Sequence, residues 1–214
     1  GLVEVITDAM SLDALKKTPS FTTLPQYFEH TYGTSKERLS MAKRNFCSSL
    51  AAYSLFCYLL LIKDRHNGNM LISSEGHIIH IDFGFMLSIA PGGAFSMETC
   101  PFKLTDEMVD VLDGLESPLF NEFVKAFTRG FIELQANAEN IISALRVLAI
   151  NSPFPCFAGR DSGVIIERLR TRLRTDLDIK NTVDHCLELI IQSHNHMGTR
   201  NYDSFQYYTN GILP

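Results

Sequence analysis

The sequence predicts a mostly helical α+β domain with one small β-hairpin, and three observations lead to this fold class. Residues 45–62 form a stretch of 18 residues without a charge, which is long enough for a buried helix. Residues 69–81 instead alternate around a polar turn, as the two strands of a hairpin do. The 214 residues, of which 45% are hydrophobic and 20% charged, contain no repeat of fixed period, so we expect one domain with a substantial core.

Three helices are predicted before the hairpin. Residues 8–17 carry apolar side chains at helical spacing, and a second helix is expected to begin near Thr23 and Pro25. Ser35 is a suitable N-cap for a long helix that runs to Ile62. The uncharged part of this helix has the minimum length of a membrane span, but serines and tyrosines interrupt it. A buried core helix is therefore favoured by about five to one.

The hairpin turns at residues 73–76 and is followed by an irregular stretch, 85–101. Loops of this length are uncommon in compact domains and are usually functional. Helical patterning resumes after Thr105, a suitable N-cap, and continues to the C-terminal residues. Breaks in it are expected at Pro118, Gly130, Pro153 and Gly198.

Charge and cysteine content exclude some classes of protein. The net charge of −5 argues against a nucleic-acid partner, because such binders usually carry a basic stripe. The 5 cysteines are widely spaced without a CxxC pair, which indicates neither a disulfide framework nor a zinc module and suits a reducing, cytosolic setting. The chain begins with Gly1 and shows no signal peptide, so we expect a piece of a longer protein.

Arginines gather between residues 160 and 174, where a solvated helix face is favoured by about two to one over contact with anionic lipid.

Residues that can carry chemistry form two clusters at the ends of the hairpin, KDRHNGN at 63–69 and DFG at 82–84. A hairpin brings its ends together, so the oxygens of Asn69 and Asp82 can point into one small volume, a donor set that suits Mg²⁺. Asp64 lies beside that volume, where it can accept a hydroxyl proton, and His66 can donate to phosphoryl oxygens. Singly, each aspartate would be an ordinary loop cap by about three to one, but the joint spacing reverses that preference.

The DRHNGN and IDFG segments resemble the catalytic and metal-binding loops of the phosphatidylinositol 3- and 4-kinase superfamily. Protein kinases read HRD with an Asn five residues after the Asp, whereas here the order is Asp-Arg-His with Asn69 five residues after Asp64. The runs GHIIHIDFGF at 76–85 and PFKLTDEMVDV at 101–111 look like the type III phosphatidylinositol 4-kinases. YDSFQYYTNGI at 202–212 is similar to the C-terminus of their beta class, and GLVEVI at 1–6 looks like the segment after the hinge.

The resemblance implies that residues 1–214 are the C-terminal lobe of a bilobal kinase, with a catalytic loop at 63–69 and an activation loop at 82–104. We expect the N-terminal lobe, which carries the phosphate loop and its lysine, to precede Gly1, and neither GxGxxG nor GxxxxGK[ST] occurs in this chain. The fragment alone is therefore expected to bind ATP poorly and to transfer almost nothing.

The resemblance also implies a role for particular residues, with ATP as co-substrate. It implies Asp64 as catalytic base, His66 at the γ-phosphate, Asn69 and Asp82 as ligands of Mg²⁺ or Mn²⁺, and Leu71 and Ile81 as the floor under adenine.

The expected activation loop carries little charge. Between Phe85 and Phe102 the only charged residue is Glu98. A headgroup with extra phosphates would call for several lysines or arginines, so plain phosphatidylinositol is favoured. Lys103, which follows directly, is predicted to approach the bridging phosphate of the lipid.

Together with the resemblance, these features predict a lipid kinase that transfers the γ-phosphate of ATP to phosphatidylinositol, and the resemblance implies its 4-hydroxyl as acceptor. A phosphatidylinositol 3-kinase stays open as an alternative, because spacing cannot choose a hydroxyl. A non-catalytic membrane or adaptor fragment is a second alternative, although it would have no need of the Asp64, Asn69 and Asp82 trio. The resemblance implies a cytoplasmic protein in peripheral contact with membranes, those of the Golgi by its beta class, with a small GTPase or adaptor as recruiting partner.

Overall fold

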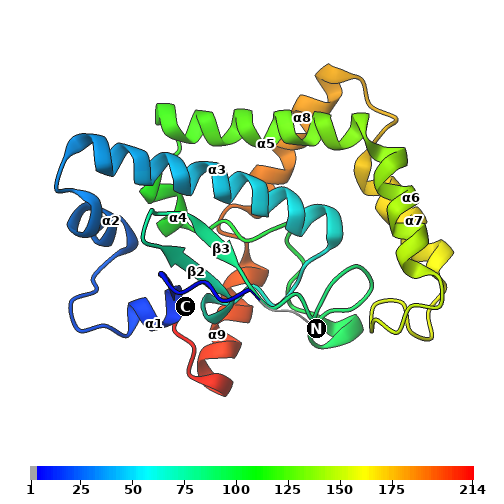
Figure 1. The fold of residues 1–214 in the computed structure, drawn as a ribbon, viewed down its shortest axis with the longest axis horizontal. Helices are drawn as coiled ribbons and strands as arrows, with labels where there is room; N and C mark the ends of the chain where they lie inside the picture. The colour runs from blue at the N-terminus through cyan, green and yellow to red at the C-terminus, as the bar shows by residue number, and fades with distance from the viewer. Residues whose placement is uncertain (1–3) are drawn as a thin grey trace.

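The computed structural model describes residues 4–214, so the first three residues of the GLVEVI segment lie outside the described residues. The described chain is mostly helical with a small antiparallel sheet, which confirms the predicted fold class (Figure 1). The helices are α1 (Leu12–Lys16), α2 (Leu24–Tyr32), α3 (Lys36–Leu60), α4 (Asp106–Val111), α5 (Pro118–Ala136), α6 (Ala138–Ala149), α7 (Ser162–Leu173), α8 (Ile179–Ser193) and α9 (Met197–Asn210). The strands are β1 (Ala9–Ser11), β2 (Met70–Ser73) and β3 (Ile78–His80), and short 3-10 turns occur at η1 (Asn67–Asn69) and η2 (Gly93–Phe95).

Helix α3 lies at the centre of the fold, in contact with α5 and with strand β3 (Figure 1). Ser35 caps it by accepting the backbone N–H of Arg38, as predicted. Its buried side chains include Phe46 and Leu50, and each such burial stabilises the fold by about 1.5–3 kcal/mol. The prediction of a buried core helix is confirmed, and no helix in the described part of the chain combines the length and apolarity of a membrane span.

Helix α5 continues through Gly130, where we predicted a break, and that prediction is wrong. A Cβ atom at this position would lie only 2.5 Å from Cδ1 of Leu55 on α3. The glycine therefore permits a close approach of two helices, and the contact between them outweighs its low helix propensity. Pro118 and Gly198 lie in the first turns of α5 and α9, so they mark helix starts as expected.

The predicted hairpin is confirmed as β2 and β3, which pair in the register Met70↔His80 and Ile72↔Ile78. Gly76 in the connecting turn has φ +86°, and a Cβ there would lie 2.8 Å from atoms of Ala42. A third strand, β1, pairs with β2 and was not predicted. Helix α1 accordingly covers only Leu12–Lys16 of the helix expected over residues 8–17, because the first residues of that stretch satisfy their backbone groups on the sheet edge.

The two faces of the hairpin differ in burial. The side chains of Met70, Ile72 and Ile78 are buried on the face that meets α3. Leu71 and Ile79 alternate to the opposite face and are only partly buried. The sheet thus presents a second, more open apolar face.

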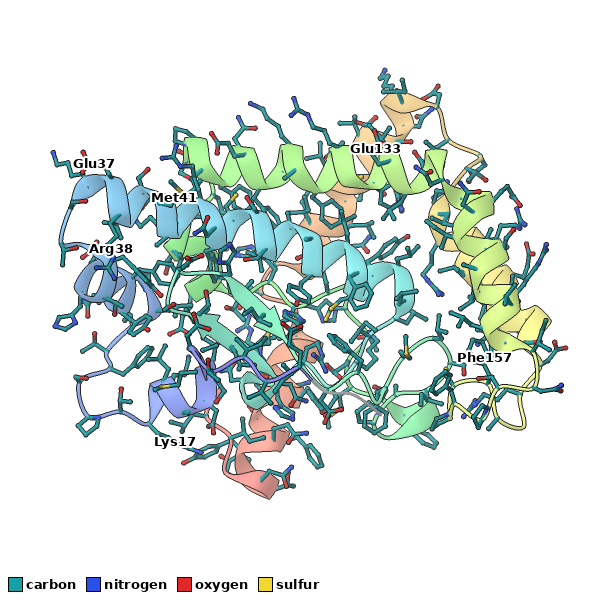
Figure 2. All side chains as sticks on the ribbon, in the orientation of Figure 1. Lys17, Glu37, Arg38, Met41, Glu133 and Phe157 are labelled. Carbon is teal, nitrogen blue, oxygen red and sulfur yellow. The ribbon has the colours of Figure 1, made fainter. Side chains whose placement is uncertain are left out.

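Helices α6 and α7 pack against each other at one end of α5 and bury a second apolar cluster (Figure 1). Phe157, labelled in Figure 2, belongs to this cluster at the connection between the two helices. The irregular 82–104 segment meets it, since the Ser88 hydroxyl donates to the carbonyl of Cys156 (2.7 Å).

The arginines of α7 are used largely within the fold. Arg170 pairs with Glu139, and Arg174 pairs with Asp176 at 3.0 Å. Arg172 donates from Nε to the carbonyl of Leu59 (2.8 Å), and burial lowers its pKa to about 10. These contacts engage three of the five arginines between residues 160 and 174 within the chain.

Candidate active site

The 63–69 loop begins where α3 ends. Leu61 takes a left-handed conformation (φ 50°) that stops the helix, and the N–H of Lys63 then donates to the carbonyl of Phe85 (2.9 Å). Asp64 is also left-handed, with φ 67°, which is uncommon for a residue other than glycine. The loop closes with the turn η1, which leads directly into β2.

Three side chains contact the carboxylate of Asp64. Asn69 Nδ2 donates to Oδ2 (3.3 Å) and to the backbone carbonyl of Asp64 (3.0 Å). The hydroxyl of Tyr202 on α9 donates to Oδ1, and Nε2 of His66 lies 3.5 Å from the same oxygen. Among the described residues Oδ2 accepts the Asn69 amide alone and has a further lone pair, so Asp64 can still accept a proton.

His66 is held in one tautomer. Its Nδ1 accepts the backbone N–H of Gly68 (3.1 Å), so in the neutral ring the proton is on Nε2, the atom that faces Asp64. Burial lowers the pKa of His66, against the opposing effect of the Asp64 carboxylate. The ring is therefore a neutral donor at neutral pH.

Arg65 joins the 63–69 loop to the end of β3. Its guanidinium donates to the carbonyls of Lys63 (3.0 Å), Ile81 (2.8 Å) and Asp82. Burial lowers the pKa of Arg65, whereas the anionic groups around it oppose that shift. Sequence reasoning missed this role, although a buried arginine between two polar loops is the residue type that can bridge several carbonyls.

Asn69 and Asp82 lie on adjoining strand ends, as the hairpin predicted. The N–H of Ile81 donates to the carbonyl of Asn69 (3.0 Å), which places Asp82 one residue beyond this pairing. The carboxylate of Asp82 is exposed and accepts the N–H of Gly84 on Oδ1 (3.2 Å). The Asn69 amide donates through Nδ2, so its Oδ1 carries no hydrogen bond from the described residues. One amide oxygen and one accessible carboxylate fit a Mg²⁺ ion that keeps several water or phosphate ligands.

Leu71 and Ile81 were predicted to lie under an adenine ring, and the structure puts both on the open side of the hairpin. Leu71 is partly buried, and Ile81, two residues beyond Ile79 on the same face, is 38% exposed. The two side chains therefore belong to an accessible apolar surface beside Asn69 and Asp82.

Helix α9 contacts the 63–69 loop through residues that sequence reasoning did not select. Gln206 Nε2 donates to the hydroxyl of Tyr202 (2.8 Å), and burial together with the Asp64 carboxylate raises the pKa of that hydroxyl far above its usual range. Tyr202 is thus a permanent donor to Asp64. Beyond α9, the carbonyl of Leu213 accepts Asn67 Nδ2 (2.9 Å).

Lys103 is buried and engaged within the protein. Its Nζ lies 2.7 Å from both carboxylate oxygens of Asp203 and 3.2 Å from Oδ1 of Asn67, and its side chain is 4% exposed. In this arrangement Lys103 is not free to approach a lipid phosphate, and the predicted contact would require the ion pair to open.

A groove of about 750 Å³ lies elsewhere, between the start of α3 and the turn of the hairpin. Glu37, Arg38 and Met41, labelled in Figure 2, are among the residues that line it. It contains no residue of the 63–69 loop and not Asp82, so it is separate from the candidate site.

Comparison with known proteins shows the family of this chain. Residues 10–159 match the family model described as phosphatidylinositol 3- and 4-kinase. The chain is 46% identical to a phosphatidylinositol 4-kinase of Dictyostelium discoideum over 99% of its length, and 43% identical to phosphatidylinositol 4-kinase beta 1 of Arabidopsis thaliana over 100%. It is 39% identical, again over 100% of its length, to phosphatidylinositol 4-kinase beta of Danio rerio. The matches cover 18%, 19% and 25% of these relatives, so the chain spans a quarter of their length or less. The chain belongs to the phosphatidylinositol 3- and 4-kinase family.

Proposed function

We propose that this chain is the C-terminal lobe of a lipid kinase that transfers the γ-phosphate of ATP to the 4-hydroxyl of phosphatidylinositol. The observation that carries the proposal is the meeting of Asp64, Asn69 and Asp82 at one end of the hairpin. The choice of lipid and of hydroxyl follows the names of the relatives, which are phosphatidylinositol 4-kinases.

In the proposed reaction Asp64 accepts the proton of the attacking hydroxyl. Asn69 and Tyr202 orient its carboxylate, because each donates to one of the two oxygens. Neutral His66 donates from Nε2 to the phosphoryl group as negative charge develops on it.

Asn69 Oδ1 and Asp82 would hold Mg²⁺, or Mn²⁺, which when bound neutralises charge on the ATP phosphates. Leu71 and Ile81 would form the apolar floor under adenine. ATP also needs a phosphate loop and a lysine, which we propose are supplied by an N-terminal lobe, so the chain alone transfers little.

The lipid proposal rests on the 82–104 segment as activation loop. Between Phe85 and Phe102 the one charged residue of this loop is Glu98, and Lys103 is paired with Asp203. The loop therefore offers no free cation for extra phosphates within the described structure, which supports plain phosphatidylinositol as substrate. Peripheral contact with a Golgi membrane from the cytoplasmic side, through a small GTPase or adaptor, is part of the proposal and rests on the beta-class resemblance alone.

The test uses the full-length protein with Mg-ATP and phosphatidylinositol vesicles, followed by chromatography of the deacylated lipid. We expect a 4-phosphate, and Asp64→Asn should lower turnover by about 10²-fold or more in a protein that still unfolds cooperatively. Asp176→Asn makes the same chemical change at an exposed ion pair and should leave turnover unchanged. A 3-phosphate would identify a 3-kinase instead, and a wild-type protein that labels no lipid would favour the non-catalytic adaptor.

A further inference from the structure

Glu98 is a buried carboxylate at the end of the 82–104 segment. Its side chain is 8% exposed, and its two oxygens accept the backbone N–H groups of Asp64 and Arg65. Within residues 4–214 it forms no ion pair, since the cations beside it donate to carbonyls instead. A buried carboxylate is costly unless hydrogen bonds satisfy it, so these two amides are what keeps Glu98 in place.

The two amides form a small concave anion site. Successive N–H groups point the same way when a left-handed residue lies in the turn, and Asp64 has φ 67°. The carboxylate of Glu98 occupies this concavity with one oxygen on each N–H. It thereby stabilises a left-handed backbone conformation that is unfavourable for a residue other than glycine.

We propose that Glu98 is a positioning residue for the lipid kinase reaction, which holds Asp64 in its reactive orientation by binding the backbone of the catalytic loop. The inference rests on the proposed function for the role of Asp64. Asn69 and Tyr202 fix the carboxylate of Asp64, whereas Glu98 fixes the peptide from which that carboxylate extends.

Because Glu98 belongs to the 82–104 segment, its contact also joins that segment to the 63–69 loop. Glu98 belongs to the segment proposed to read the lipid headgroup, and in the same segment the Cys100 carbonyl accepts Lys63 Nζ (3.1 Å). The activation loop and the catalytic loop are thus joined on both sides of Asp64. The contact of this segment with the base is therefore made through peptide N–H groups rather than through the Asp64 side chain.

The chemistry of the contact determines which substitution tests it. Glutamine has the size of glutamate but only one acceptor oxygen, so its NH₂ group would face one of the two amide donors. Glu98→Gln therefore breaks the contact without a change in volume. Glu98→Asp keeps the charge and the two acceptors on a shorter stem, so it should restore part of the function. Glu116→Gln makes the same chemical change at an exposed residue and is the matched control.

The experiment compares the full-length wild type with these variants by two measurements. Amide hydrogen exchange should be about tenfold or more faster at Asp64 and Arg65 in Glu98→Gln, with α5 unchanged, and intermediate in Glu98→Asp. The kcat for lipid phosphorylation should fall about tenfold or more while KM for ATP stays within about twofold, a split that general destabilisation would not produce.

Exchange at Asp64 and Arg65 equal to the wild type in both Glu98 variants would overturn the inference, as would a kcat equal to that of Glu116→Gln. If Glu98→Gln does not fold, Glu98→Asp decides by the same two measurements. A wild-type protein that phosphorylates no lipid refutes the proposed function, while the exchange rates still decide whether Glu98 holds the loop.

Discussion

The ion pair between Lys103 and Asp203 should be a major contribution to the attachment of α9. Both groups are buried, with 4% and 10% of their side chains exposed, and the ammonium lies 2.7 Å from each carboxylate oxygen. Removing one partner leaves the other charge buried and alone, which typically costs about 3–5 kcal/mol. In a domain of this size, each kcal/mol of lost stability lowers Tm by about 2–4 °C, so Lys103→Met should lower Tm by about 6–20 °C.

A double-mutant cycle measures the pair directly. Lys103→Met, Asp203→Leu and the double variant are followed by thermal unfolding, and the double variant should recover most of the loss because it leaves no unpaired charge. Additive losses in the double variant, or a loss below about 1 kcal/mol for Lys103→Met, would refute the reasoning. The latter result would also return Lys103 to the lipid-binding role expected from the sequence.

Two further predictions concern stability. Burial lowers the pKa of His80 to about 3, so the folded ring stays neutral while the unfolded ring takes up a proton below about pH 6.5. The contribution of His80 to the free energy of unfolding is present above pH 6.5 and is lost as the pH falls towards 3, at about 1.4 kcal/mol per pH unit. In urea unfolding, the free energy of His80→Phe should therefore fall less steeply with decreasing pH than that of the wild type. An equal pH dependence in the two proteins would contradict the assignment. Gly76→Ala should destabilise the protein by about 2 kcal/mol or more because positive φ and the contact with Ala42 act together. Gly114→Ala has a similar φ of +91° but open space around it, so equal losses in urea unfolding would show that the Ala42 contact contributes nothing.

Local signals in the sequence predicted much of the fold. Thr23, Ser35 and Thr105 each accept a backbone N–H at the start of the expected helix, because capping depends on residues only three apart. The hairpin followed from alternation for the same reason. Strand β1 was missed because Ala9–Ser11 has no strand pattern of its own and becomes a strand only by pairing with β2. Gly130 was misread because its close contact with α3 is invisible in the sequence of α5.

In the candidate site too, contacts between residues close in the sequence were predicted and contacts between distant residues were not. Asp64, Asn69 and Asp82 could be brought together from the sequence because one short hairpin connects them. Tyr202 could not, since it reaches Asp64 from α9, 138 residues later. The pairing of Asp203 with Lys103 likewise joins residues that are 100 positions apart. Glu98 was noticed as an isolated charge, but its partners are backbone amides, which leave no complementary residue in the sequence to find. Arg65 was missed for the same reason, because its guanidinium donates to backbone carbonyls rather than to a complementary side chain.

The contacts of the 63–69 loop with Tyr202 and Leu213 have a consequence for synthesis on the ribosome. Helix α3 and the hairpin are made early and can form from neighbouring residues as they leave the exit tunnel. The carboxylate of Asp64 and the amide of Asn67 can form their hydrogen bonds to Tyr202 and Leu213 only after these partners are translated, about 140 residues later. The ribosome therefore completes α3 and the hairpin before it makes the residues that fix the proposed catalytic base.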